Sequence, residues 1–342
     1  METVEPELVR VSIGTATVLG LDITVLKEKP TTAYLQTYWD GRCIANCKFC
    51  AQAREATSEM LRVARALYPA YPTQKVLNAL KIASEKRRIF RVCFQTVNYP
   101  GMLDDLENLV KLTRLKLGGI IPISASTHAI SKENLEKLKD AGVTNMVIPL
   151  DACSKKVFDK IKGFKAKSPY RWEKHWKTLK EAAKIFGTGY VGTHLILGLG
   201  ETEFEAAKIF QKLYEEKIYC GLFAFTPIQG TPLAEFEKPS VESYRVLQLI
   251  HYLTYKNKLK FKNLEFDKNG NIVNINIERK EILKAVDSGK PFQTTGCPNC
   301  NRPFATESPT KIYNYPRLPT KTEIKLIKKQ LAKRIPQLRG KL

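Results

Sequence analysis

The chain has 342 residues, of which 43% are hydrophobic and 9% aromatic, which is enough for one large globular domain or a domain with an extension. Its 56 lysines and arginines against 34 acidic residues give a formal net charge of +22, which fits an acidic protein partner, a nucleic-acid partner or the solvated lysine-rich surface of a thermophile. No run approaches the length of a transmembrane helix, and the first residues lack a signal-peptide pattern. The eight cysteines indicate metal ligation better than a disulfide framework. We therefore expect a cytoplasmic protein with no membrane partner.

After an N-terminal lead of residues 1–30, strand-like and helical patterns alternate through residues 31–257. The expected strands are 32–39, 88–97, 119–126, 145–152, 190–199 and 220–227. The expected helices are 57–68, 73–86, 102–115, 131–141, 169–186, 203–217 and 241–257. Six such units predict an α/β fold with a parallel sheet, a partial (β/α)6 TIM-like barrel whose functional loops follow the carboxyl ends of the strands.

Residues 258–342 follow a different pattern. A turn at 267–270, a strand at 272–277 and helices near 278–288 and 321–333 are expected there. We expect this segment to be a C-terminal extension that packs on the barrel and covers its mouth.

Three cysteines lie within eight residues, Cys43, Cys47 and Cys50, with the spacing C-x3-C-x2-C. Thiolates suit iron–sulfur clusters, and three local ligands leave one iron of a four-iron cluster open to a substrate or cofactor. The alternatives are a zinc knuckle and a disulfide-forming loop. Structural zinc normally takes four ligands, and no histidine lies nearby, so an open cluster is predicted.

This motif resembles that of the radical S-adenosylmethionine (SAM) enzymes, and Phe49 matches the aromatic residue that packs near the adenine in that family. The resemblance implies that the three cysteines bind a [4Fe-4S] cluster whose open iron chelates SAM. It also implies that reduction cleaves SAM to a deoxyadenosyl radical that abstracts hydrogen from an unactivated carbon.

Further candidates for binding SAM follow the expected strands. The run Leu197-Gly-Leu-Gly-Glu-Thr202 is similar to the G-L-G-E-T run of biotin synthase, so Gly198, Gly200 and Glu201 are expected near the nucleoside, although an ordinary strand-to-helix turn would have the same residues. The segment ending at Asp151 is similar to the N-L-D segment of biotin synthase, and its carboxylate could hold ribose hydroxyls or cap a helix.

Side chains on other strand ends and on one helix complete this set. Ser124 and Ser126 offer hydroxyls at the expected mouth. The family uses a basic residue for the SAM carboxylate in the region of Arg171 and His175, so either could serve, and a solvated helix face is the alternative.

A second cysteine set points to an auxiliary cluster. Biotin synthase carries a cysteine near the second strand as a ligand of its sulfur-donating [2Fe-2S] cluster, and this chain has Cys93 there. The other cysteines of that site are missing, because the following strands offer serines and, at the fifth strand, Gly192 and Thr193. A cluster of the biotin-synthase type therefore cannot be built in the same way.

The C-x2-C of Cys297 and Cys300 in the extension is a candidate replacement, with Cys93 as the third ligand of an auxiliary [4Fe-4S] cluster and Cys153 as its rival. Half of a zinc site and a redox dithiol are the alternatives. Cys220 is expected to be a core thiol.

The chain as a whole resembles the two-component lipoyl synthases of archaea and some bacteria. The resemblance implies a sulfurtransferase that inserts sulfur into the octanoyl chain of an acidic lipoyl carrier domain, beside a second radical SAM subunit and an electron donor such as ferredoxin. Three alternatives stay open. The first is a radical SAM enzyme of the biotin-synthase-like, methylornithine or hydrogenase-maturation type without sulfur transfer. The others are an RNA-modifying radical SAM enzyme and a non-enzymatic iron–sulfur scaffold. No recognised RNA-binding module is present, so nucleic acid is not the expected partner.

Overall fold

The computed structural model describes residues 5–335 and residue 338. An eight-stranded sheet forms its centre, with the strand order β10-β9-β8-β7-β6-β2-β1-β5. Six of these strands are parallel: β2 (Thr32–Thr37), β6 (Arg91–Gln95), β7 (Ile123–Ser126), β8 (Asn145–Val147), β9 (Val191–Leu197) and β10 (Tyr219–Ala224). Within the described residues β10 and β5 do not pair with each other, so the sheet is a partial barrel. The predicted α/β fold with six parallel strands is confirmed.

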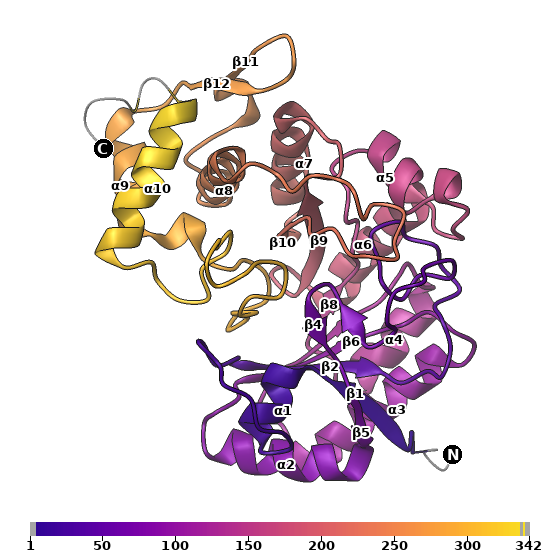
Figure 1. The fold of residues 1–342 in the computed structure, drawn as a ribbon. Helices are drawn as coiled ribbons and strands as arrows, with labels where there is room; N and C mark the ends of the chain where they lie inside the picture. The colour runs from indigo at the N-terminus through magenta and orange to yellow at the C-terminus, as the bar shows by residue number, and fades with distance from the viewer. Residues whose placement is uncertain (1–4, 336–337, 339–342) are drawn as a thin grey trace.

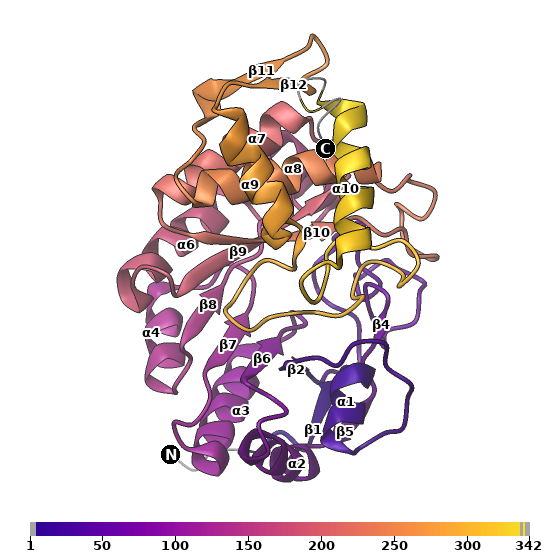
Figure 2. The same cartoon turned by 90° about the vertical axis from the view of Figure 1, so that its left-hand side faces the viewer.

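Helices cover the outer face of this curved sheet, whereas the loops of the extension approach its inner face (Figure 2). The covering helices are α2 (Thr73–Glu85), α3 (Met102–Leu117), α4 (Lys132–Asp140), α5 (Lys155–Ile161), α6 (Trp172–Phe186), α7 (Glu203–Glu215) and α8 (Val241–Tyr255). Each buries one apolar stripe, as Leu106, Leu109 and Val110 of α3 do. The start of α7 is fixed by a capping box between Thr202 and Glu205.

The N-terminal lead takes part in the sheet, which the sequence did not predict. Strand β1 (Leu8–Val11) pairs antiparallel with β2 on one side and with β5 (Ala70–Pro72) on the other. Helix α1 (Ile13–Leu19) follows directly, because Ser12 accepts a hydrogen bond from the Thr15 backbone and caps it.

The helix expected over 57–68 was wrong. These residues form an irregular loop and a small hairpin of β3 (Arg62–Val63) and β4 (Ala66–Leu67). Its apolar residues have helical spacing, but Ala64 adopts a φ of 51° and turns the chain back, while Arg65 donates its backbone N–H to Ala305 of the extension. A contact with a segment some 240 residues away therefore overrides the local pattern.

The other expected elements are present, although most of the strands are shorter than predicted. Residues 148–152, for example, are mostly buried and apolar without being strand, and only Asp151 makes an isolated bridge, to Leu195. Apolar loop residues at the ends of buried strands continue the hydrophobic pattern, so the pattern does not mark where hydrogen bonding stops.

The extension begins with a hairpin of β11 (Leu264–Phe266) and β12 (Ile272–Ile275) around the predicted turn, followed by α9 (Arg279–Ser288). The last helix is α10 (Lys321–Arg334), which lies beside α8 and α9 in Figure 1. Between α9 and α10 the chain forms a short 3-10 helix, η3 (Lys290–Phe292), and then runs as irregular loops toward the strands (Figure 1).

Arg245 of α8 anchors these loops. Its side chain is fully buried and donates to the carbonyl oxygens of Ile312, at 2.6 Å, and Tyr313. It also donates to Gln248 Oε1 at 2.6 Å. Because a buried guanidinium is costly unless its donors are satisfied, these bonds fix the path of the extension over the barrel.

None of the described helices is long and apolar enough to cross a membrane.

Candidate active site

A cavity of about 690 Å³ lies inside the partial barrel, a size typical of small-molecule sites. Its lining comes from the strands, the loop after β2 and the extension. Both sets of predicted ligands contribute to it: Cys43, Cys47, Cys50, Cys93, Cys297 and Cys300. The structure therefore brings together in one space the first cysteine loop and the Cys297–Cys300 pair, which are about 250 residues apart in sequence.

The loop that carries the first three cysteines is held by its own backbone and by Arg42. Cys43 donates its N–H to Gln52 O at 3.0 Å, and Cys50 donates to Cys47 O at 3.0 Å. The Arg42 guanidinium donates to Ala51 O at 2.9 Å and to Ser58 O at 2.7 Å. The buried Gln52 amide pairs with Gln36 of β2, which ties the loop to the sheet.

The three thiols of this loop are partly buried and close enough to influence one another. Burial raises the pKa of Cys43 and of Cys47, and it raises the pKa of Cys50 to about 12. The charge of Lys162 acts in the opposite direction on Cys43 and Cys47. Thiols in such a place ionise when they bind a metal centre, so ligation and deprotonation occur together.

Among the described residues, no group of three His, Cys, Asp or Glu side chains converges as the ligands of a single metal ion. A four-iron cluster makes a different demand, because each of its thiolates binds a different iron. The chemistry of the donors, three partly buried cysteines on one tight loop, is that of a cluster site.

Phe49, Ser126 and Asp151 line the cavity as expected. Asp151 has a φ of 62° and its Oδ2 lies 2.7 Å from Lys162 Nζ, which also donates to Pro149 O at 2.6 Å. The two charged side chains are 13% and 5% exposed, so this is a buried ion pair on the cavity wall. Sequence reasoning missed Lys162, because nothing in the lysine-rich helix around it distinguishes one lysine from the others.

Gly198, Gly200 and Glu201 do not line the cavity. The Glu201 carboxylate accepts hydrogen bonds from the backbone N–H groups of Gly198, at 2.6 Å, and Leu199, at 3.0 Å. A Cβ on Gly198, whose φ is 103°, would lie 2.7 Å from Pro239 Cδ. This geometry fits the alternative interpretation, a strand-to-helix turn with an acidic cap.

Arg171 and His175 also lie outside the cavity lining. The Arg171 guanidinium donates to Ser168 O and Tyr170 O, both at 2.8 Å. His175 is fully buried against Phe158 and Tyr170, and burial lowers its pKa to about 2, so the ring is neutral. Their expected contact with the SAM carboxylate therefore has no support from their position, and Tyr170 lines the cavity instead.

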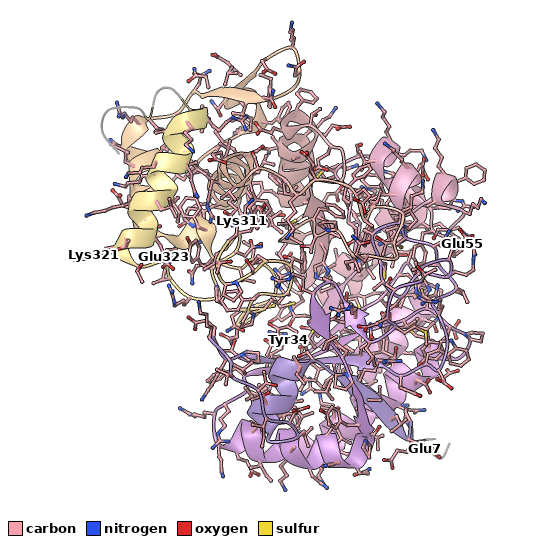
Figure 3. All side chains as sticks on the ribbon, in the orientation of Figure 1. Glu7, Tyr34, Glu55, Lys311, Lys321 and Glu323 are labelled. Carbon is pink, nitrogen blue, oxygen red and sulfur yellow. The ribbon has the colours of Figure 1, made fainter. Side chains whose placement is uncertain are left out.

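The second cysteine pair sits at the far end of the cavity. Cys297 Sγ lies 3.0 Å from Tyr219 Oη and 3.4 Å from Ser124 Oγ, and Cys300 Sγ lies 3.5 Å from Tyr34 Oη. Asn299 O accepts hydrogen bonds from the hydroxyls of Thr31 and Thr32. Figure 3 labels Tyr34, where the extension approaches β2.

Most of these contacts belong to residues at the starts of strands, whereas the first cysteine loop follows the end of β2. The expectation that the extension covers the mouth therefore needs correction. Its cysteines close the opposite end of the barrel, and the extension reaches the mouth only later, where Thr306 O accepts the hydroxyl of Thr226. Ser124, expected at the mouth, belongs with Cys297.

Cys93 shares the cavity with this pair, and Cys153 does not. Cys93 lies in β6 in register with Tyr34 of β2 and Ser124 of β7. Burial, and beyond it the neighbouring Cys297 and Cys300 thiols, raise the pKa of Cys93. Cys153 and Cys220 are buried elsewhere in the core.

A glycine makes the contact between Tyr219 and Cys297 possible. A Cβ at Gly192 of β9 would lie 2.1 Å from the Tyr219 ring, so only glycine lets that ring lie across the strand. In the sequence, Gly192 stands out only because biotin synthase has a cysteine on this strand. A glycine inside an apolar strand was the one sign that another side chain packs closely against the backbone there.

Comparison with known proteins agrees with this description. The family model of the radical SAM superfamily matches residues 41–213, which include the first cysteine loop. A biotin synthase of Clostridium botulinum (strain Hall) is 28% identical over 218 residues, covering 62% of this chain and 64% of that protein. One from Aquifex aeolicus is 25% identical over 222 residues, covering 64% and 61%. The chain thus spans less than two thirds of these relatives.

Solved structures show the same fold at low identity. Methylornithine synthase (PylB) superimposes with a TM-score of 0.52 at 14% identity, covering 71% of this chain and 72% of that one. HydG, a maturase of the [FeFe]-hydrogenase, gives 0.50 at 17% identity, covering 66% and 51%. From the matched family model, the cysteine loop and the partial barrel, we conclude that this chain belongs to the radical SAM superfamily, in its biotin-synthase-like branch.

Proposed function

We propose that the chain is a radical SAM sulfurtransferase of the lipoyl synthase type, which inserts sulfur into a protein-bound octanoyl chain. The observation that carries this proposal is the single cavity with a separate set of three cysteines at each end. An enzyme that only generates a radical needs one such set. A second set facing the same space offers a place for a consumable sulfur source.

The residues present fit both groups. Cys43, Cys47 and Cys50 would hold the SAM cluster, and Cys93, Cys297 and Cys300 the auxiliary cluster. When bound, the first cluster with SAM supplies a hydrogen-abstracting radical and the second supplies sulfide. The protein supplies the thiols and positions both sets on the wall of one cavity.

The walls between the two ends suit an alkyl chain. Val97, Val147, Ile196 and Phe225 line the cavity with apolar side chains. Such a lining excludes water from a reactive carbon and holds an unbranched chain without needing polar partners. Val25, which is fully exposed, also lines the cavity and offers an apolar rim.

A positive group beside this cavity suits an acidic carrier domain. Burial, together with the nearby charges of Arg65 and Lys311, lowers the pKa of Lys238. Arg65 lines the cavity, and Lys311 is labelled on the extension in Figure 3. The charge of Glu307 opposes this lowering of the Lys238 pKa only in part, and an excess of positive charge at a binding surface accelerates encounter with an acidic partner. A second radical SAM subunit and a ferredoxin-like electron donor remain predictions.

The decisive experiment uses an octanoyl-lysine peptide with a deuterated chain under anaerobic, reducing conditions. We expect deuterium in 5′-deoxyadenosine and sulfur on the peptide. Cys297→Ala and Cys300→Ala should abolish sulfur transfer, whereas Cys220→Ala, which removes a core thiol outside the cavity, should leave it largely intact. Sulfur transfer undiminished in the first two variants would contradict the proposal.

The fold similarity to methylornithine synthase favours one second candidate, a radical SAM enzyme without sulfur transfer. Such an enzyme would need only the first cluster. The iron content per chain separates the two: about four iron atoms for one cluster, about eight for two.

A further inference from the structure

We propose that Arg302 is a positioning residue of the second cluster site, where its guanidinium donates hydrogen bonds to an anionic iron–sulfur group held by Cys93, Cys297 and Cys300 and offsets its negative charge. This inference rests on the proposed auxiliary cluster. It assigns Arg302 a role as a hydrogen-bond donor, with the three cysteines as the protein ligands.

Two nitrogen atoms of the Arg302 guanidinium have no acceptor in the protein. Arg302 Nη2 donates to Thr295 O at 2.6 Å, but Nε and Nη1 are buried and have no hydrogen-bond partner in the protein. A buried charged donor without an acceptor is costly, so such groups in native proteins generally serve a ligand or another unseen partner. Arg302 lines the cavity together with all three cysteines.

The side chain is also held in one orientation. Its Cζ lies 3.7 Å from the centroid of the Phe223 ring, on which the guanidinium stacks. Its backbone N–H donates to Tyr34 Oη at 2.8 Å, and that oxygen in turn contacts Cys300 Sγ. Arg302 has a φ of 32°, which an arginine rarely adopts without surrounding constraints.

The neighbouring Arg91 is different, because its Nε and Nη1 already donate to acceptors within the protein. It donates to Pro298 O at 2.9 Å and to Ser124 Oγ and Asn145 Oδ1, both at 2.8 Å. Arg91 therefore supports the loop that carries the cysteines, whereas Nε and Nη1 of Arg302 have no acceptor in the protein and can serve a bound group. Burial raises the pKa of Cys300, and the charge of Arg302 is the largest influence opposing it.

The acceptor has to be anionic and able to take more than one hydrogen bond. A cluster with three thiolates and bridging sulfides meets both conditions, and hydrogen bonds to cluster sulfur raise the reduction potential. The added electron makes the cluster more negative, so a nearby cation stabilises the reduced state. Removing the cation should lower the potential.

The test is made in the full chain with Cys43, Cys47 and Cys50 all changed to alanine, so that only the auxiliary site can be loaded. Iron, sulfide, electron paramagnetic resonance and midpoint potential are measured after anaerobic reconstitution. Arg302→Gln should lower the ratio of reduced to oxidised cluster at a fixed potential about tenfold, a shift of about 59 mV for one electron. Arg302→Lys, which keeps the charge, should lower the midpoint potential less than Arg302→Gln does.

The control is Arg88→Gln, an exposed arginine beyond the end of α2, which should leave the potential unchanged. If Arg302→Gln cannot be loaded, loading of Arg302→Lys supports the assignment, and failure of both overturns it. An unchanged potential in Arg302→Gln with normal iron content also overturns it, while the proposed function stands. If the triple-alanine chain binds no iron at all, the auxiliary cluster itself is absent and both proposals fail.

Discussion

Replacing Gly192 by alanine should damage the far end of the cavity while leaving the backbone conformation permitted. The new Cβ would lie 2.1, 2.4 and 2.5 Å from three carbon atoms of the Tyr219 ring, far inside normal contact. The ring must move away, and its hydroxyl then loses the 3.0 Å contact with Cys297 Sγ. The variant thus acts on a proposed cluster ligand without touching any cysteine.

Three contributions set the change in the free energy of unfolding of Gly192→Ala. Overpacking in a well-packed interior costs about 1–3 kcal/mol. The lost contact between hydroxyl and sulfur costs about 1 kcal/mol. Replacing glycine by alanine in a permitted conformation stabilises the fold by about 0.4–1 kcal/mol, because it reduces the conformational entropy of the unfolded chain. We therefore expect Gly192→Ala to lower the free energy of unfolding by about 1–4 kcal/mol, and to lower the iron bound at the second site.

Urea denaturation of the iron-free, reduced protein measures the first effect and anaerobic iron analysis the second. Gly119→Ala is the matched control, because a Cβ there meets nothing within 4 Å, and it should be neutral or slightly stabilising. In a Tyr219→Ala background the cost of Gly192→Ala should disappear. A cost that persists without the tyrosine ring, or a Gly192→Ala chain as stable as the control, would refute this reasoning.

Three further outcomes are expected. Cys93→Ser should lower the iron content from about eight to about four atoms per chain, whereas Cys153→Ser should not, as measured by anaerobic iron analysis. Lys162→Met should lower the free energy of unfolding by about 3 kcal/mol in urea denaturation, because it leaves a buried aspartate unpaired, and a variant that also neutralises that aspartate should lose less. Hydrogen bonding from Arg317 lowers the pKa of Glu323 to about 2 from an ordinary 4.5, so its stabilising effect is full above pH 4.5 and is lost as the pH falls toward 2. In Glu323→Gln, acid titration of stability should show a weaker decline over that window.

The parallel half-barrel could be predicted from the sequence, because each of its six strands is a short apolar run followed by an amphipathic helix. The first cysteine loop could be predicted as well, since its three ligands are local and their spacing alone indicates a cluster site. The elements that could not be predicted are those whose conformation depends on contacts with residues far away in the sequence. Strand β1 is recognisable only beside β2, and residues 57–68 depart from helix because the extension binds Arg65.

The far end of the cavity illustrates the same limit at the level of residues. Cys297 and Cys300 were predicted as ligands from their spacing, but their position at the starts of the strands depends on how the extension folds back. Arg302 follows Cys300 by two residues, and no pattern in the sequence distinguishes it from the other arginines. Its importance lies in two unpaired buried donors, which only three-dimensional contacts can reveal.

The central claim is that the chain holds two clusters, one at each end of one cavity. Anaerobic quantitation of iron and sulfide in the reconstituted wild-type chain and in the Cys297→Ala/Cys300→Ala double variant tests it most directly. We predict about eight iron atoms per chain in the wild type and about four in the variant, with SAM cleavage retained. About four in both would contradict the account, because the second set of cysteines would then hold no cluster.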